Sequence, residues 1–334
     1  MIAFCGYAVL SFVLVGFYRH LALRQRWLDA PNARSSHTAV TPRGAGIVFA
    51  PLIIGAAITL PPHQRTTLVP LLGVAFVGWW DDLRGAPASV RFGLYALCAA
   101  VTALLIFSGW QVTRLDGAFA VSAPLLYLVL SIPALLWLIN LYNFMDGING
   151  IAATEALFVL TVIAVFAYGT PYGEAFLPLH LFAVAAIGGF LLWNFPIGKV
   201  FMGDAGSAFL GGLLGALMLW SELMGGPSPT VWLILCGVFI VDSGYTLLTR
   251  MLTGQPWYAA HRLHAYQRLS DRLRGSHART VGILTVVNLF WLLPMAWLVH
   301  RQGINPLLGA GLAYTPLIGA CYGLKAGIPA SGRV

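Results

Sequence analysis

Polar residues interrupt an otherwise apolar sequence between positions 140 and 152. Asn140, Asn143 and Asp146 recur at every third position, and Gly147 and Gly150 follow them. If the preceding helix continues through this stretch, the three polar side chains cover roughly 120° of one helix face. The glycines would let the backbone approach a ligand closely. Such a cluster is costly in a membrane protein unless it borders water or a ligand, so it predicts a site; the alternative is a polar loop with a helix cap.

Two neighbouring carboxylates, Asp81 and Asp82, directly follow Trp79 and Trp80. A pair of this kind can approach one hard cation, and Mg²⁺ prefers a few carboxylates together with phosphate oxygens and water. The alternative is an aromatic belt at a membrane interface, followed by a solvated acidic turn. The pair alone therefore suggests a magnesium site without establishing it.

A third carboxylate, Asp204, lies between Gly203 and Gly206, just before an apolar segment. If that segment is a helix, its N-terminus favours phosphate, and a carboxylate there would bring the metal that phosphates share. Asp204 or Ser207 could at the same time cap the helix. We therefore predict a metal and phosphate site at this point of the chain.

Two histidines, His261 and His264, lie in the largest basic loop, and one helical turn would present both on the same face. They do not specify zinc, because no cysteine and no HExxH pattern accompanies them. Arg262 and the arginines that follow make the loop suitable for binding phosphate. A basic loop near anionic lipid headgroups is the alternative. Arg43, in a first loop with hydroxyls and glycines, also suits a ligand that carries phosphate.

The composition indicates how these residues are positioned. Of 334 residues, 59% are hydrophobic and 9% are charged, whereas soluble domains carry about 25% charged residues. We therefore predict an all-α polytopic membrane protein. The four cysteines lie singly in apolar segments, with neither a disulfide framework nor metal-type spacing. A net charge of +8 would suggest nucleic acid in a soluble protein, but here the basic residues follow a membrane topology.

About eleven apolar segments have a length suited to membrane spans. They lie at about 1–18, 44–60, 68–80, 92–110, 122–139, 151–168, 176–193, 208–223, 230–249, 280–299 and 306–324. Sixteen of the 19 basic residues fall in alternate loops and the C-terminal tail, and three (Arg65, Arg114, Arg301) fall on the other side. The positive-inside rule therefore predicts the N-terminus outside and the C-terminus in the cytoplasm.

The predicted topology gathers the polar motifs on one side of the membrane. The cytoplasmic loops are about 19–43, 81–91, 140–150, 194–207 and 250–279. A transporter or flippase would need polar groups at mid-depth and a route to both faces, yet Asp242 is the one such carboxylate we identify. We expect Asp242 to be functional or paired. An enzyme with its active site on the cytoplasmic face is therefore favoured.

Taken together, the motifs resemble the polyprenyl-phosphate N-acetylhexosamine-1-phosphate transferases, glycosyltransferase family 4. The matching motifs, in family order over about 31–268, are Ser35-Ser-His-x-x-x-Thr-Pro-Arg-Gly44, Asp81-Asp82, Asn140-x-x-Asn143-x-x-Asp146-Gly147, Phe201-Met-Gly-Asp204-x-Gly-Ser207 and the histidine loop. The cell-wall branch carries three consecutive histidines, whereas this chain has His261-Arg-x-His264-Ala-Tyr-Gln. That form, with eleven spans and an outer N-terminus, resembles the branch that initiates O-antigen synthesis.

The resemblance implies one integral membrane transferase domain over 1–334, in the inner membrane of a bacterium. Undecaprenyl phosphate would attack the β-phosphorus of a UDP-N-acetylhexosamine, releasing UMP and forming a lipid-linked sugar pyrophosphate for O-antigen or related polysaccharide synthesis. The partners would be these substrates and the bilayer, with no nucleic acid; the sugar and a homodimer are left open. A lipid phosphatase would use histidine and arginine, but it leaves the Asp-Asp and Gly-Asp-x-Gly-Ser elements unexplained.

The resemblance also implies roles for the residues. Mg²⁺, with Mn²⁺ as an alternative, would be held by Asp204 and one of the Asp81–Asp82 pair, which we take to be Asp82. Asp81 would align the lipid phosphate or accept a residual proton. The remaining predictions are Asp146, Asn140 and Asn143 for the metal shell or nucleotide, Asn194 and Phe201 for uridine, His261, Arg262 and His264 for phosphate or sugar, and Arg43 and Ser207 for substrate. The short third span and the glycine-rich eighth and ninth spans are candidates for the lipid groove.

Overall fold

The computed structural model describes residues 2–31, 36–115, 124–256, 258–259 and 261–329. Within these ranges the regular secondary structure is helical, apart from a two-residue strand β1 (Leu28–Asp29) that pairs antiparallel with β2 (Thr41–Pro42). The α-helices are α1 Ile2–Gln25, α2 Gly46–Ala56, α3 Pro62–Arg65, α4 Pro70–Arg84, α5 Ala88–Leu115, α6 Pro124–Met145, α7 Ile151–Phe166, α8 Pro171–Asn194, α9 Asp204–Leu223, α10 Pro229–Leu235, α11 Gly237–Leu252, α12 Ala265–Arg272, α13 His277–Val287, α14 Leu293–His300 and α15 Pro306–Gly323.

Each predicted apolar segment contains helix in the described chain, although residues 122–123 at the start of the fifth segment lie outside it. Six stretches are long and apolar enough to cross a membrane: α1, α5, α6, α8, α9, and α13 with α14. The bent pair α10–α11 would make a seventh, and α2 and α7 are shorter apolar helices. These features are those of a polytopic helical membrane protein. The count of eleven spans and their orientation stay predictions.

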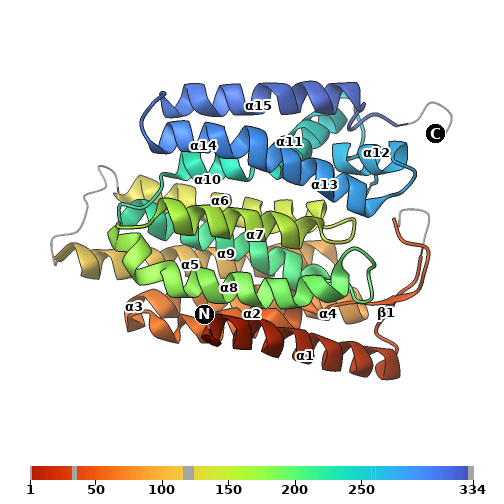
Figure 1. The fold of residues 1–334 in the computed structure, drawn as a ribbon, viewed down its shortest axis with the longest axis horizontal. Helices are drawn as coiled ribbons and strands as arrows, with labels where there is room; N and C mark the ends of the chain where they lie inside the picture. The colour runs from red at the N-terminus through yellow and green to blue at the C-terminus, as the bar shows by residue number, and fades with distance from the viewer. Residues whose placement is uncertain (1, 32–35, 116–123, 257, 260, 330–334) are drawn as a thin grey trace.

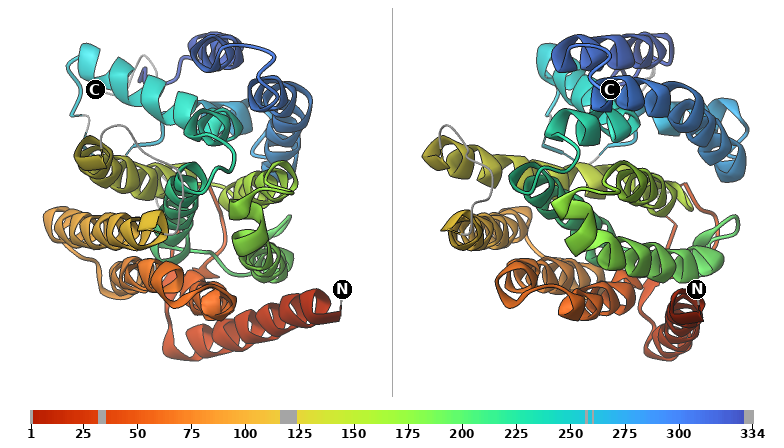
Figure 2. Two further views of the ribbon diagram at one scale, coloured as in Figure 1. Left: turned by 90° about the vertical axis from the view of Figure 1, so that its left-hand side faces the viewer. Right: turned by 60° about the vertical axis from the view of Figure 1, so that its left-hand side comes forward.

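Helix α9 forms the centre of the bundle (Figure 2), and every one of its residues except Glu222 is buried. It packs against α6, α4 and α2. Small residues permit this close packing: a Cβ on Gly211 would lie 2.2 Å from the Leu138 carbonyl oxygen, and one on Gly78 would lie 2.4 Å from the Asp204 backbone. The eighth predicted span, which corresponds to α9, is therefore a core helix. Its part in a lipid groove stays a prediction.

The predicted ninth span is broken into α10 and α11, whose axes differ by 78°. Cys236 lies at the break, and Gly237 opens α11 at a point where a Cβ would lie 3.1 Å from the Tyr314 ring and 3.2 Å from the Leu292 side chain. Between α13 and α14, residues Asn288–Leu292 form one π-helical turn. Neither interruption was predicted, because the apolar pattern continues through both.

The polar loops gather at one end of the bundle, where β1 and α12 lie in Figure 1. Backbone hydrogen bonds join the first loop to the segment before α9: the Phe201 amide donates to the Pro42 carbonyl (2.8 Å), and the amides of Ala45 and Gly46 donate to the carbonyls of Phe201 (3.1 Å) and Met202 (2.9 Å). Two motifs separated by about 160 residues are therefore held side by side.

Candidate active site

Asp204, the first residue of α9, is the centre of a polar network. Its Oδ1 accepts a hydrogen bond from Nη2 of Arg43 at 2.7 Å. Its Oδ2 accepts from Nδ2 of Asn143 at 3.0 Å and from Nη1 of Arg91 at 3.0 Å. The partners come from the loop after β2, from α6 and from α5, so four separate parts of the chain meet at one carboxylate.

Asp82, at the end of α4, holds the first turn of α9 in place. Its side chain is completely buried, and it accepts hydrogen bonds from the backbone amides of Asp204 (3.0 Å) and Ala205 (3.2 Å). Nε of Arg43 lies 2.6 Å from its Oδ1. Burial raises the pKa of Asp82 to about 8, while the Arg43 guanidinium and the two amides act against this shift.

The amides at the start of α9 are all engaged within the protein. Those of Gly206 and Ser207 donate to the Gly203 carbonyl at 3.0 and 3.1 Å, and those of Asp204 and Ala205 donate to Asp82. The alternative that Asp204 or Ser207 caps the helix does not hold, because neither side chain caps it and the capping carboxylate comes from α4. We also predicted that the N-terminus of this helix binds phosphate. A phosphate at these amides would have to displace the Asp82 carboxylate.

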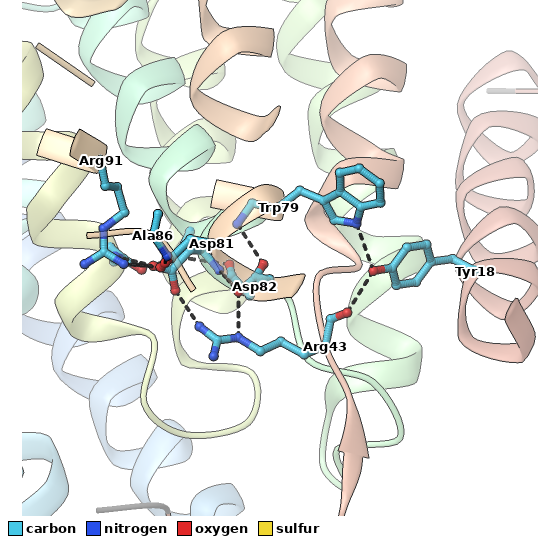
Figure 3. Close-up of polar contacts among 12 residues, drawn as sticks. Tyr18, Arg43, Trp79, Asp81, Asp82, Ala86 and Arg91 are labelled. Carbon is cyan, nitrogen blue, oxygen red and sulfur yellow. Dashed lines mark hydrogen bonds and ion pairs between the residues drawn. The ribbon is translucent and has the colours of Figure 1, made fainter. Parts of the chain in front are cut away.

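Asp81 points away from Asp82 and toward Arg91 (Figure 3). Its Oδ1 accepts a hydrogen bond from the Ala86 amide at 2.6 Å, and its Oδ2 forms an ion pair with Nη1 of Arg91. Burial acts to raise the pKa of Asp81, but the Ala86 amide and Arg91 together lower it below its ordinary value. The adjacent carboxylates thus have separate partners.

A polar pocket of about 210 Å³ opens beside this network. It is lined by Asp29, Ser36, His37, Arg43, Asn143, Asp146, Gly147, Ile148, Asn149, Asn194, Phe201, Met202, Gly203, Asp204, Gln267 and His277. The residues predicted from the sequence that line it are Arg43, Asn143, Asp146, Asn194, Phe201 and Asp204. The first-loop, Asn-x-x-Asn-x-x-Asp and Gly-Asp-x-Gly-Ser motifs therefore share one pocket, and Ser35 lies outside the described residues.

Asp146 faces the pocket without a hydrogen-bond partner among the described residues. Burial and the nearby Asp204 carboxylate raise the pKa of Asp146 to about 7, against the effect of Arg43. Helix α6 ends at Met145, so the predicted helix does not continue through Asp146. Asn140 does not line the pocket, because its Nδ2 donates to the Leu136 carbonyl of its own helix at 2.7 Å.

Asn194 connects two walls of the pocket, since its Oδ1 accepts from the Gly150 amide (2.6 Å) and its Nδ2 donates to the Val200 carbonyl (3.0 Å). Phe201 presents its ring to His37, with 4.8 Å between centroids and a 63° angle between planes. The pocket therefore has an aromatic wall beside an amide.

Ser207 is buried and does not line the pocket. Its hydroxyl donates to Oδ1 of Asn143 at 3.0 Å, so it orients the amide that contacts Asp204. The structure therefore places Ser207 behind the pocket wall instead of against a substrate.

We expected Asp242 to be either functional or paired, and in the structure it is paired with hydrogen-bond donors. It accepts hydrogen bonds from the amides of Ala265 and Tyr266, each at 2.8 Å, and its Oδ1 lies 3.2 Å from Nδ1 of His264. The His261 ring stacks on that of His264 at 4.8 Å between centroids. A buried carboxylate on α11 therefore caps α12 and orients a histidine.

The histidine loop borders the pocket, but its predicted residues do not line it. Arg262 instead forms an ion pair with Asp271 at 2.6 Å, and His264 is buried. Gln267, one turn after His264, reaches the pocket. In the described chain, His264 and Arg262 therefore contact carboxylates outside the pocket and not those that line it.

Several residues of the pocket and of the adjoining network escaped the sequence predictions, among them His277 and Arg91. His277, which we took to be structural, lines the pocket and accepts a hydrogen bond from the Asn149 amide at 3.2 Å. Arg91 completes the carboxylate network from α5. His277 lacked a neighbouring motif, and Arg91 resembled any cytoplasmic basic residue. His37 could have been found, because it belongs to the first-loop motif.

Comparison with known proteins shows the family to which this chain belongs. A family model described as "Glycosyl transferase family 4" matches residues 65–222, which include Asp81, Asn143 and Asp204. A phospho-N-acetylmuramoyl-pentapeptide-transferase of Thermosynechococcus vestitus is 30% identical over 274 residues, 73% of this chain and 67% of that protein. The chain belongs to glycosyl transferase family 4. This family 4 protein is thus an enzyme, a phosphoglycosyltransferase, and the transporter alternative falls away.

Two further relatives bear on whether the chain belongs to the O-antigen branch of the family. A probable undecaprenyl-phosphate N-acetylglucosaminyl 1-phosphate transferase of Bacillus subtilis is 27% identical over 280 residues, 80% of this chain and 76% of the relative. A decaprenyl-phosphate N-acetylglucosaminephosphotransferase of Mycolicibacterium smegmatis is 29% identical over 321 residues, 83% and 76% of the two chains. These names span N-acetylglucosamine and muramoyl-pentapeptide donors, so the family is confirmed and the O-antigen branch stays a prediction.

Proposed function

We propose that this family 4 enzyme transfers an N-acetylhexosamine 1-phosphate from a UDP-sugar to undecaprenyl phosphate on the cytoplasmic face of a bacterial inner membrane. The reaction would begin the synthesis of O-antigen or a related surface polysaccharide. The observation that carries the proposal is Asp204, held beside a polar pocket by Arg43, Arg91 and Asn143. The names of the relatives support polyprenyl phosphate as the acceptor.

In the proposed reaction, an oxygen of the lipid phosphate attacks the β-phosphorus of the donor and the bond from that phosphorus to UMP breaks. Such a transfer depends on positioning and charge neutralisation more than on covalent chemistry. Arg43 supplies positive charge at the pocket wall. Arg91 does not line the pocket, but it supplies positive charge to Asp204, which does. The product would be a sugar joined to the lipid through pyrophosphate.

The carboxylates of the pocket suit a hard cation such as Mg²⁺, or Mn²⁺ as the alternative. Asp146 offers a carboxylate without a hydrogen-bond partner in the described chain, next to Asp204. Both oxygens of Asp82 are engaged by amides, and one also by Arg43, so Asp82 fits the predicted ligand role less well. We therefore assign the cation to Asp204 with Asp146 or Asp81. When bound, it would neutralise the pyrophosphate and the departing UMP.

The described residues do not include a preformed group of three or more metal-ligating side chains. The contacts of Asp204 explain why, since both of its oxygens are held by arginines. A cation would therefore bind through a rearrangement of side chains, with Asp146 as the carboxylate already free to take part.

Asp81 is poorly suited to accept a proton, because the Ala86 amide and Arg91 occupy its oxygens and its pKa is lowered. A general base is also hardly needed, since a phosphate monoester has a second pKa near ~6 and is mostly dianionic at neutral pH. We therefore propose that Asp81 positions Arg91 and the lipid phosphate and does not act as a base.

The nucleotide would lie at the Phe201 end of the pocket, with uracil against the Phe201 ring and near Asn194. His37 would limit the depth to which the base enters, because it already contacts the Phe201 ring. The histidine-loop form His261-Arg-x-His264 favours a simple N-acetylhexosamine over the muramoyl-pentapeptide. Which hexosamine is used would depend on a few contacts, each worth about 1–3 kcal/mol.

The test uses the purified chain with undecaprenyl phosphate, Mg²⁺ and a panel of UDP-N-acetylhexosamines, with UMP release as the readout. We expect UMP with one preferred donor and only when lipid is present. Asp204→Asn serves as the inactive control, and Arg84→Gln, an exposed change outside the site, as the active one. Absence of UMP with every donor, from a folded protein, would contradict the proposal; UMP release without lipid would point to hydrolysis.

A further inference from the structure

Arg91 bridges two carboxylates that stand on different helices. Its Nη1 contacts Oδ2 of Asp81, on α4, and lies 3.0 Å from Oδ2 of Asp204, on α9. Its side chain is 26% exposed and it does not line the pocket. One nitrogen atom thus occupies the space between two of the carboxylates that could bind a cation.

The network contains three carboxylates and two guanidinium groups. Asp81, Asp82 and Asp204 would repel one another at short range, and the arginines compensate that repulsion. Arg43 is bound to the fully buried Asp82, which would be costly to leave unpaired. The two partners of Arg91 are each 12% exposed. Arg91 is therefore the counter-ion that can leave at lower cost.

We propose that Arg91 is an exchangeable counter-ion, which joins Asp81 to Asp204 in the metal-free protein and withdraws when a divalent cation takes its place. The inference rests on the cation site of the proposed function. A cation shared by Asp81 and Asp204 would need the space that Nη1 of Arg91 occupies, because that atom contacts an oxygen of each. With Arg91 in place the three carboxylates and two guanidinium groups sum to a charge of about −1, and a divalent cation in place of Arg91 brings the sum to about 0.

Tyr95 provides a second position for the displaced guanidinium. It lies one helical turn after Arg91 on α5, and residues four apart are neighbours on a helix face. Its side chain is completely buried, and its hydroxyl has no hydrogen-bond partner in the described chain. An unpaired buried hydroxyl is costly, so a partner that reached Tyr95 in another state would be stabilising. Arg91 lies on the same helix face and interacts electrostatically with Tyr95.

The first test measures cation affinity in detergent without nucleotide or lipid, by isothermal titration with Mg²⁺ and by Mn²⁺ electron paramagnetic resonance. Arg91→Gln removes the competitor, so we expect about tenfold tighter binding. Arg91→Lys keeps the positive charge, so this variant should bind the cation much as the unchanged chain does. Arg84→Gln removes an exposed arginine at the end of α4, close to Asp81 in sequence, and should also leave cation binding unchanged. Unchanged or weaker binding by Arg91→Gln would overturn the proposal.

Thermal unfolding gives a readout that does not depend on activity. Without metal, Arg91→Gln should unfold at a lower temperature, because the carboxylates lose a counter-ion. Adding Mg²⁺ should raise its melting temperature by more than it raises that of the unchanged chain, since binding is tighter. An equal or smaller rise would contradict the exchange.

The second test changes the receiving residue. Tyr95→Phe should weaken cation binding severalfold in the chain with Arg91, because the displaced guanidinium loses its partner. In the Arg91→Gln background the same change should have no effect, since there is no guanidinium to receive. Equal weakening in both backgrounds, or none in either, would overturn the exchange with Tyr95.

The failure of this inference can be distinguished from the failure of the proposed function. If the unchanged chain binds no divalent cation, or Asp204→Asn binds equally well, the metal site itself is refuted. If Asp204→Asn abolishes binding while Arg91→Gln leaves it unchanged, the site stands and only the exchange fails.

Discussion

The carboxylate of Asp82 accepts hydrogen bonds from the backbone amides of Asp204 and Ala205, at 3.0 and 3.2 Å. These two residues follow Asp82 in the sequence by 122 and 123 positions. Asp242 does the same for α12, where it accepts from Ala265 and Tyr266. A buried carboxylate from a neighbouring helix therefore sets the first turn of both α9 and α12. Side-chain capping of this kind satisfies orphan amides and favours negative charge at a helix N-terminus.

The Asp82 cap predicts the effect of Asp82→Asn. The neutral amide cannot satisfy two backbone donors and Arg43 as the carboxylate does, so we expect a loss of about 1–3 kcal/mol in the free energy of unfolding. UMP release should also fall strongly, since Asp204 is positioned by this contact. Denaturant unfolding in detergent and the UMP assay measure the two effects, and an unchanged stability would show that the cap contributes little.

Asp204→Asn is expected to reduce UMP release about a thousandfold or more while the chain remains folded. The change removes the charge that Arg43 and Arg91 hold and that a cation would require, and such electrostatic contributions dominate phosphoryl transfer. The size-exclusion profile and helical circular dichroism should match the unchanged chain. Activity within a few fold of normal would remove Asp204 from the centre of the mechanism.

Removal of divalent metal should abolish UMP release, and addition of Mg²⁺ should restore it. The carboxylates of Asp146 and Asp204 face the same pocket, and without a cation they would repel the donor pyrophosphate. The experiment titrates Mg²⁺ and Mn²⁺ into chelator-treated enzyme. Full activity in metal-free buffer would refute the assignment of these carboxylates to a metal.

The helices could be predicted because apolar length is a local property that the sequence displays directly. The meeting of the first-loop, Asp-Asp and Gly-Asp-x-Gly-Ser motifs followed from family resemblance, and the geometry agrees in placing Arg43, Asp82 and Asp204 in contact. What could not be predicted depends on distant contacts. Arg91 and His277 belong to no motif, and only folding places them at the site.

Local patterns also misled in specific ways. The three-residue spacing of Asn140, Asn143 and Asp146 predicted one helix face, but α6 ends at Met145. The histidines and arginines of the basic loop together suggested a phosphate site, whereas the buried His264 lies against Asp242 and does not line the pocket. In each case a hydrogen bond or a helix end that spacing cannot show determines where the side chain points.

Replacement of His264 by alanine tests the histidine loop. We expect about a tenfold loss of kcat/KM, because the imidazole lies against Asp242 and supports the start of α12, from which Gln267 reaches the pocket. The matched control is His300→Ala, on α14, where the ring stacks on Phe166 away from the site. A rate equal to that of the unchanged chain would leave the loop with only its topological role.

Phe201→Leu tests the nucleotide end of the pocket. Stacking of a base on an aromatic ring contributes about 1–3 kcal/mol, so loss of the ring should raise the KM for the UDP-sugar about tenfold or more, with a smaller effect on kcat. Phe144→Leu, at an exposed position on α6, is the matched control and should leave both parameters unchanged. Inhibition by UMP should weaken in parallel, because UMP carries the same base. If KM stays constant, or if kcat alone falls, the uracil does not lie on Phe201, and the His37 side of the pocket would have to hold another part of the donor.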